Sequence, residues 1–307
     1  MMLRGRRPTM PPERIVAAAE DGMGFNRHLR RVVPSAATLT YNPFFKFASG
    51  LMDIIPALIF PDLRKIPPNY MRIRVGVGNS VFANQIGYLT AGKNFWLYML
   101  ANGFISPASV IVDIGCGCGR FAHHIRDYAF SGERFQGHYH GIDIDEEMLA
   151  WCRANFDAER FTFINSTHES ATYRNATARS GGFDLPIADA SADLVFSTSL
   201  YTHLLQPEVE NYTREAFRVL KPGGVMAMFV FSMDHPPSSF GDRHTFRHRI
   251  GQAHVETLEN PEAAVAYDEA YLVALAHGLG FTQVRVIAVA NGVQQLLIAR
   301  KGATGAP

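Results

Sequence analysis

Three glycines stand at alternate positions, Gly115, Gly117 and Gly119, directly after the run Val110–Ile114, in which three β-branched residues precede an acid. Glycine permits a positive φ and leaves no Cβ in the way of a ligand, so this stretch predicts a sharp turn on which a ligand binds. Residues 120–130 follow with apolar positions at helical spacing, and the first N–H groups of a helix have no partner within the helix. Strand, glycine turn and helix in this order indicate the opening of a nucleotide-binding α/β domain.

The glycine spacing separates this turn from two other nucleotide-binding loops. A dinucleotide fingerprint requires G-x-G-x-x-G, but Arg120 stands where its third glycine belongs. A P-loop requires Gly-Lys-Ser/Thr, which does not follow here. The pattern is instead G-x-G-x-G with Asp113 two residues before the first glycine.

A second strand and helix follow at the expected distance. Residues 138–143 read as a strand that ends in Asp143, and acidic residues begin the helix after it. A carboxylate at the end of this strand can accept hydrogen bonds from both hydroxyls of a ribose. The competing role, capping the helix, suits Asp145 better, because Asp145 directly precedes Glu146 and the apolar helix positions.

The rest of the chain predicts the remainder of a sheet. Proline and glycine in Lys221-Pro222-Gly223-Gly224 end a helix and turn the chain into an apolar strand. Asn291-Gly292 between two apolar runs is a strong signal for a hairpin. The predicted elements are a fourth strand with a polar loop over 191–204, a helix over 207–220, a strand over 225–231, a helix over 264–277, and strands over 284–290 and 293–300.

Together these motifs resemble the class I S-adenosylmethionine (SAM)-dependent methyltransferases over residues 70–301. The glycine turn is similar to their motif I, and the string Arg218 to Gly224 matches their Arg-Val-Leu-Lys-Pro-Gly-Gly. The resemblance implies a Rossmann-like α/β fold with seven mostly parallel strands, of which the last is antiparallel, and SAM as cofactor. The residues that it places at the cofactor are Asp113, Gly115, Cys116, Gly117, Gly119, Asp143, Ile144, Asn165 and Ser197.

The adenine pocket departs from the family pattern. Many members place an acid at the end of the third strand, and here Asn165 stands nearest that position. Its carboxamide oxygen can accept the same hydrogen bond from the adenine amino group. The connection from Ser166 to Gly182, which contains Tyr173 and Arg174, is longer than usual and is expected to close over SAM or to contact substrate.

The predicted catalytic residues follow the fourth strand. Methyl transfer from a sulfonium requires an aligned nucleophile, and a hydroxyl nucleophile also requires a base to take its proton. His203 is the predicted base, and Tyr201 is expected to line the methyl group. The alternative role of His203, capping or orienting its loop, is equally compatible with the sequence.

Composition limits the class of protein. The chain has 307 residues, 47% of them apolar, and a net charge of +1, so it can bury a full core and has no general attraction to nucleic acid. Three cysteines cannot form a disulfide framework, which favours a reducing, cytoplasmic location. The locally basic N-terminus, which includes Arg4, Arg6 and Arg30, is interpreted as a solvated arm, and no secretion signal is recognised.

Two regions flank the predicted SAM-binding domain of residues 106–301. Residues 1–105 are expected to form a helical cap, and an insert near 233–263 is expected to contact substrate. The apolar stretch 44–60 is too short and too interrupted for a transmembrane segment, so it is expected to cover the active site or to mediate homo-oligomer contacts. Arg243, Arg247 and Arg249 in the insert suit an anionic small molecule, or else form a solvated loop balanced by nearby glutamates.

Two further motifs are interpreted as structural. Asn42-Pro43 followed by Phe44 resembles the Asn-Pro-Pro-aromatic motif of amino-group methyltransferases, but it lies outside the fourth strand and is interpreted as a turn that enters a helix. His244 and His248 could bind a metal if they were helical, yet no Glu follows the first His, so no metal site is predicted.

The predicted function is methyl transfer from SAM to a small molecule, at a hydroxyl oxygen of a natural product or sugar. Two alternatives remain open at this point. One is a methyltransferase for RNA or protein, against which the near-neutral charge counts. The other is a SAM-binding or nicotinamide-binding protein of different function, because a fold does not determine its chemistry.

Overall fold

The structure is a computed structural model that describes residues 39–75, 84–127, 129–130, 133–166, 183–235, 244–289 and 293–302. The chain forms two compact units, residues 1–87 and 88–307. The predictions for the basic N-terminal arginines, for Tyr173 and Arg174, for Arg243 and for the Asn291-Gly292 turn lie outside the described residues.

The described part of the first unit is helical, as predicted. Asn42 caps the helix α3, because its Oδ1 accepts the N–H groups of Phe44 at 2.9 Å and Phe45 at 3.2 Å, and Pro43 occupies the first turn. The interpretation of Asn42-Pro43 as a helix entry is therefore confirmed. The helices are α3 (Pro43–Ile59), the 3-10 helix η1 (Pro61–Lys65), α4 (Asn69–Arg74) and α5 (Asn84–Ala101), which continues into the second unit.

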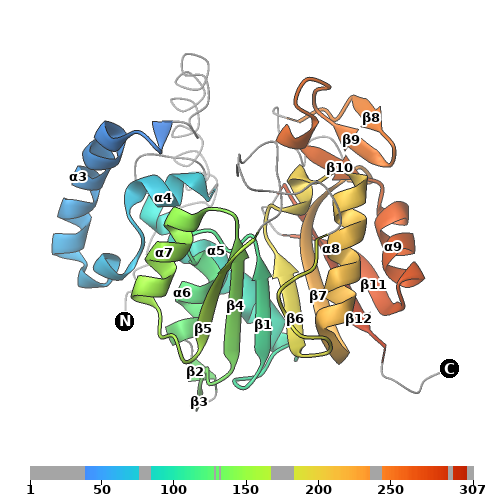
Figure 1. Ribbon diagram of the computed structural model, residues 1–307, viewed down its shortest axis with the longest axis horizontal. Helices are drawn as coiled ribbons and strands as arrows, with labels where there is room; N and C mark the ends of the chain where they lie inside the picture. Colours follow the sequence, from blue (N-terminus) through green and yellow to red (C-terminus); the bar gives the residue numbers. More distant parts are fainter. Residues whose placement is uncertain are drawn as a thin grey trace, which may run out of the picture. The chain divides into compact units, whose positions relative to one another are not determined.

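The second unit contains a sheet of seven strands in the order β5-β4-β1-β6-β7-β12-β11 (Figure 1). All neighbours up to β7 pair in parallel, whereas β12 is antiparallel to both β7 and β11. The predicted antiparallel last strand is therefore confirmed. The strands are β1 (Val110–Ile114), β4 (His138–Asp143), β5 (Phe161–Asn165), β6 (Ala192–Ser197), β7 (Leu220–Ser232), β11 (Phe281–Ala288) and β12 (Gln295–Lys301).

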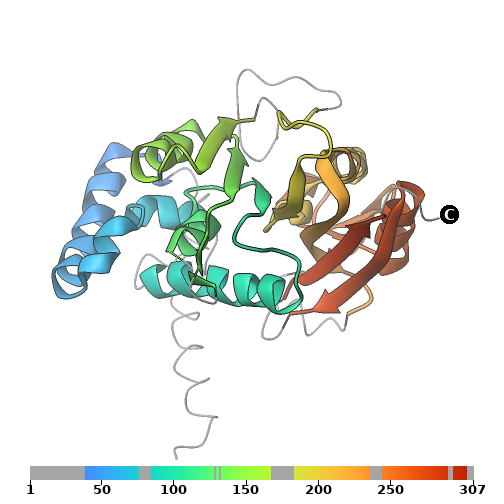
Figure 2. The same ribbon diagram turned by 90° about the horizontal axis from the view of Figure 1, so that it is seen from below.

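Alternate side chains of the strands enter two separate cores. In β1, Ile111 packs with aromatic residues of α5 and α6, whereas Val112 packs with α8 and α9. Because successive strand residues point to opposite faces, helices cover both sides of the sheet (Figure 2). The helices of this unit, besides α5, are α6 (Arg120–Asp127), α7 (Glu146–Asn155), α8 (Gln206–Val219) and α9 (Glu269–Gly278).

Two predicted helices have different bounds. The helix predicted over 120–130 ends at Asp127, and a short hairpin of β2 (Ala129–Phe130) and β3 (Glu133–Arg134) follows. The prediction of a helix over 264–277 is wrong at its start: Val265–Tyr267 form strand β10, and the helix begins at Glu269. These residues pair in parallel with the end of β7, an interaction that local periodicity does not reveal.

The expected insert near 233–263 contributes strands to the sheet. Antiparallel pairing joins β10 to β9 (Ala253–Val255) and β9 to β8 (His248–Ile250). The three strands therefore extend the sheet from the carboxyl end of β7 (orange in Figure 1). His244 lies in the segment before β8 and His248 lies within it, so the helical pair that a metal site required does not form.

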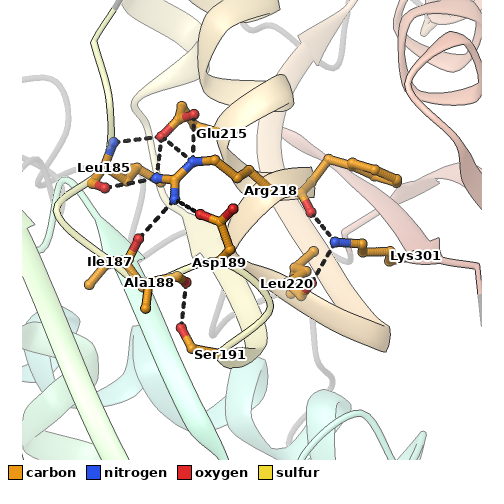
Figure 3. A network of polar contacts seen from close by, with 10 residues as sticks. Leu185, Ile187, Ala188, Asp189, Ser191, Glu215, Arg218, Leu220 and Lys301 are labelled. Carbon is orange, nitrogen blue, oxygen red and sulfur yellow. Dashed lines mark hydrogen bonds and ion pairs between the residues drawn. The ribbon is translucent and has the colours of Figure 1, made fainter. Parts of the chain in front are cut away.

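The Arg218 to Gly224 string does more than end a helix. The Arg218 guanidinium donates to Glu215 and Asp189 and to the carbonyl oxygens of Leu185 and Ile187, which fixes the segment before β6 against α8 (Figure 3). These carboxylates raise the pKa of Arg218. The turn residues also shift the register between β6 and β7: Ala192 pairs with Leu220, but Leu194, two residues further on, pairs with Val225, five residues further on.

Candidate functional site

The glycine turn adopts the conformation that its sequence predicts. Gly115, Gly117 and Gly119 have φ values of 80°, 54° and 76°, in the left-handed region that favours glycine. A Cβ at Gly119 would also lie 3.0 Å from the ring of Phe156. The N–H of Gly115 donates to the carbonyl of Ile142 at 2.8 Å, so the turn lies against the end of β4.

Asp143 binds the glycine turn directly. One carboxylate oxygen accepts the N–H of Gly117 at 2.7 Å, and the other accepts the N–H of Asp145 at 2.9 Å. Burial raises the pKa of Asp143, and these backbone hydrogen bonds oppose the rise. The side chain keeps part of its surface exposed, so it can accept further hydrogen bonds from a ligand on the turn.

Asn165 lies beside Asp143, because the two residues pair across β4 and β5. The Asn165 Nδ2 atom donates to the carbonyl of Ile144 at 3.4 Å, which leaves the carboxamide oxygen as the acceptor toward a ligand. Asp145 caps α7 by accepting the N–H groups of Glu147 and Met148. Asp145 is therefore the residue that caps α7, as the sequence predicted, and Asp143 is not needed for that role.

Other predicted cofactor residues lie beneath the turn. Asp113 is fully buried, its Oδ2 accepts the hydroxyl of Tyr139, and its Oδ1 has no hydrogen-bond partner among the described residues. Burial raises the pKa of Asp113 to about 7, against the lowering effects of Tyr139 and Arg120. Ser197 is also fully buried and donates to the sulfur of Met228 at 3.2 Å.

The thiols at the turn are not reactive groups. Cys116 and Cys152 are buried, and their Sγ atoms face the carbonyl of Gly117 at 3.7 and 3.8 Å. Burial raises the pKa of Cys116 well above its usual value, so it stays a neutral thiol. Its contribution to ligand binding is therefore confined to backbone and packing.

His203 lies in the 3-10 helix η2 (Tyr201–His203), which follows β6. Its Nδ1 is 2.9 Å from the carbonyl oxygen of Glu262 in η4 (Pro261–Ala263). A carbonyl only accepts, so Nδ1 carries the proton and Nε2 is the basic nitrogen of the neutral ring. Burial lowers the pKa of His203, and the backbone acceptors at Glu262 and Ala263 oppose this effect.

Tyr201 is placed differently from His203. Its side chain is fully buried in the core, and its hydroxyl lies 3.0 Å from Thr213 Oγ1, which itself donates to the carbonyl of Val209. Tyr201 therefore donates to Thr213 and is held in the packing between η2 and α8. This environment gives the residue a supporting role, and His203 is left as the candidate for proton transfer.

A polar cluster that sequence reasoning missed lies at the end of β7. Ser232 Oγ donates to Glu269 Oε1 at 3.0 Å, and His235 Nε2 lies 3.3 Å from the same oxygen. Asp234 accepts the N–H of Glu269 at 2.7 Å. The cluster depends on the parallel pairing of β10 with β7, and no local signal joins residues that are 37 positions apart.

In the ranges that the structure describes, no group of three or more His, Cys, Asp or Glu side chains could hold a metal ion. None of the described helices is long and apolar enough to cross a membrane.

Comparison with known proteins identifies the domain. Residues 112–228 match the family described as "Methyltransferase domain". This segment contains the glycine turn, Asp143, Asn165 and His203. Residues 112–228 therefore form a methyltransferase domain, for which SAM is the cofactor.

Several curated proteins are similar to parts of the chain. An uncharacterized methyltransferase of Synechocystis is 28% identical over 216 residues, which are 69% of this chain and 85% of that protein. An arsenite methyltransferase of Aquipseudomonas alcaligenes is 30% identical over 128 residues, 40% of this chain and 34% of that protein. The chain spans less than half the length of several such relatives.

The acceptors named for the relatives differ in chemistry. Besides the arsenite enzyme, they include a sterol 24-C-methyltransferase of Gibberella zeae and a malonyl-[acyl-carrier protein] O-methyltransferase of Marinomonas. Among solved structures, a SAM-dependent methyltransferase of Mesorhizobium loti aligns with a TM-score of 0.46 and 18% identity, over 70% of this chain and all of that one.

Proposed function

We propose that this protein transfers a methyl group from SAM to a hydroxyl oxygen of a small molecule such as a natural product or sugar. When bound, SAM supplies an electrophilic methyl group on a sulfonium. The chain holds the ribose through Asp143, the adenine through Asn165 and the amino acid end at the glycine turn. Positive φ values at all three glycines and the partly exposed carboxylate beside them support this arrangement.

The acceptor atom is proposed from the state of His203. The hydrogen bond of Nδ1 to the Glu262 carbonyl fixes the tautomer, and the lowered pKa keeps the ring neutral near pH 7. The Nε2 atom is then able to accept the hydroxyl proton while the oxygen–carbon bond forms. An oxygen nucleophile needs such a base, whereas a free amine or a thiolate already offers its lone pair. The hydrogen bond between His203 Nδ1 and the Glu262 carbonyl, from which the tautomer follows, is the single observation that supports the choice of oxygen.

A labelling experiment tests the proposal. The purified chain is incubated with SAM that carries a labelled methyl group and with a library of hydroxylated, amino and thiol compounds. We expect label in compounds with a free hydroxyl and none in analogues whose hydroxyl is already methylated. Transfer only to amines, to RNA or to protein would contradict the proposed acceptor class while leaving the SAM site intact.

The variant His203→Asn sharpens this test. The Asn carboxamide nitrogen can donate to the Glu262 carbonyl in place of Nδ1, but the side chain cannot accept a proton. We expect SAM affinity to stay within about twofold and turnover to fall by about 10² or more. Turnover equal to that of the unsubstituted chain would give His203 a structural role only.

A further inference from the structure

The exposed apolar surface of the described residues is concentrated on one segment. Eleven of the sixteen large apolar side chains that are exposed there fall between residues 39 and 60. Phe44, Ile55 and Leu58 in α3 keep 79%, 68% and 67% of their surface exposed. A contiguous apolar patch of this kind marks a surface that interacts with another molecule or with a membrane.

The helix α3 also has its polar side turned inward. At 100° per residue, the exposed apolar side chains from Phe44 to Ile59 fall within an arc of about 160°. On the opposite side, Ser49 is buried, and Asp53 contacts Arg72 and accepts the N–H of Asn69 at 2.8 Å. The polar residues thus attach α3 (blue in Figure 1) to α4, and the apolar face of α3 is left exposed. This orientation is the reverse of a helix that covers a hydrophobic core.

Charge is distributed unevenly along the same chain. Residues 1–75 contain twelve Lys and Arg but five Asp and Glu, a net charge of +7, whereas residues 76–307 contain 17 and 23, a net charge of −6. In the described part of the first unit, residues 39–75, the balance is five against two. Such a difference between segments favours binding of the N-terminal segment to an anionic surface.

These observations decide between two occupants of the apolar face. A second copy of the chain would bring two segments of the same strong positive charge together, which opposes association. An anionic bilayer accepts apolar side chains at the level of its headgroups and attracts a segment with net positive charge. The length of α3, 17 residues with Pro56 and Asp53 inside it, suits a helix that lies in the plane of the interface.

We propose that α3 is an interfacial helix, which binds the surface of an anionic lipid bilayer through the face formed by Phe44, Phe47, Leu51, Ile55 and Leu58. This inference does not depend on the proposed methyl acceptor. It concerns where the chain is held, and it is tested without any measurement of methyl transfer.

The experiment measures co-sedimentation of the full chain with lipid vesicles. One set of vesicles contains phosphatidylcholine alone, and the other contains phosphatidylcholine with phosphatidylglycerol. The double variant Ile55→Gln with Leu58→Gln removes the centre of the apolar face. The matched control, Leu97→Gln with Leu258→Gln, changes two residues of similar exposure, 63% and 57%, in the second unit.

We expect the unsubstituted chain to bind the anionic vesicles, and to bind them more weakly at high salt. Its binding to vesicles of phosphatidylcholine alone should also be weaker. The α3 variant should bind at least about tenfold more weakly, and the control should stay within about twofold. Circular dichroism verifies that both variants are folded. The proposal is overturned if the unsubstituted chain does not bind anionic vesicles or if both variants lose binding equally. A dimer by light scattering that the α3 variant dissociates would instead make this face a contact between copies.

Discussion

Replacing Asp143 by alanine removes the carboxylate that accepts hydrogen bonds from two backbone N–H groups. The same carboxylate is the proposed acceptor for the ribose hydroxyls. The two hydrogen bonds, from Gly117 at 2.7 Å and Asp145 at 2.9 Å, go to a charged group. Such bonds contribute about 1.5–3 kcal/mol each. The side chain is partly exposed, so water replaces some of the loss, and we expect the free energy of unfolding to fall by about 3 kcal/mol.

The same substitution should weaken SAM binding. Two hydrogen bonds from the ribose hydroxyls to a carboxylate are worth about 3 kcal/mol together, which corresponds to a dissociation constant about 100-fold higher. Isothermal titration calorimetry with SAM measures this change, and denaturant unfolding measures the stability of the same sample.

The variant Asp145→Ala separates the two effects. It removes the cap of α7, at a cost of about 1 kcal/mol, but keeps the backbone N–H that Asp143 accepts. We expect Asp145→Ala to lose stability while its SAM affinity stays within about threefold. Equal SAM affinity in Asp143→Ala and the unsubstituted chain would refute the assignment of the ribose to Asp143.

Three further results are expected. The pKa of Asp113 is about 7 in the folded chain and lower in the unfolded chain, so between these two values the folded chain keeps a proton that the unfolded chain has released. The free energy of unfolding should therefore fall as pH rises from about 4 to 7. Relative to Asp113→Asn, the unsubstituted chain should thus lose about 4 kcal/mol over this range in urea unfolding at stepped pH, and parallel curves would contradict the burial argument. Because the pKa of His203 is lowered, kcat/KM should stay constant as the pH is lowered through the range in which histidine usually titrates. A fall in kcat/KM that begins near pH 7 on lowering the pH would contradict this expectation. In Gly141→Ala the new Cβ would lie 2.7 Å from the Phe163 ring, so the free energy of unfolding should fall by about 1–3 kcal/mol, against little loss for Gly50→Ala, which meets nothing within 4 Å.

The sequence predicted those residues of the site whose roles follow from their immediate neighbours in the chain. The alternating glycines specify positive φ, Asp143 ends a strand, and Asp145 precedes a helix, so each could be predicted from about ten neighbouring residues. The mostly parallel seven-stranded sheet and the antiparallel direction of its last strand followed from the family resemblance, whereas the spatial order of the strands was not predicted.

Contacts between distant residues could not be predicted in this way. The His203 ring is fixed by the Glu262 carbonyl, 59 residues away, and Tyr201 finds its hydrogen-bond partner on α8. Val265–Tyr267 fit a helical period as well as a strand, and only pairing with β7 decides between them. The sequence likewise shows an apolar stretch over 44–60, but the contact of Asp53 with Arg72 determines which side of α3 faces outward.

The most direct test of the SAM site is a crystal structure of the chain with S-adenosylhomocysteine bound. We expect both ribose hydroxyls within hydrogen-bond distance of the Asp143 carboxylate, the adenine beside Asn165 and the amino acid end at the turn of Gly115 to Gly119. A ligand bound elsewhere, or a ribose that makes no contact with Asp143, would contradict it.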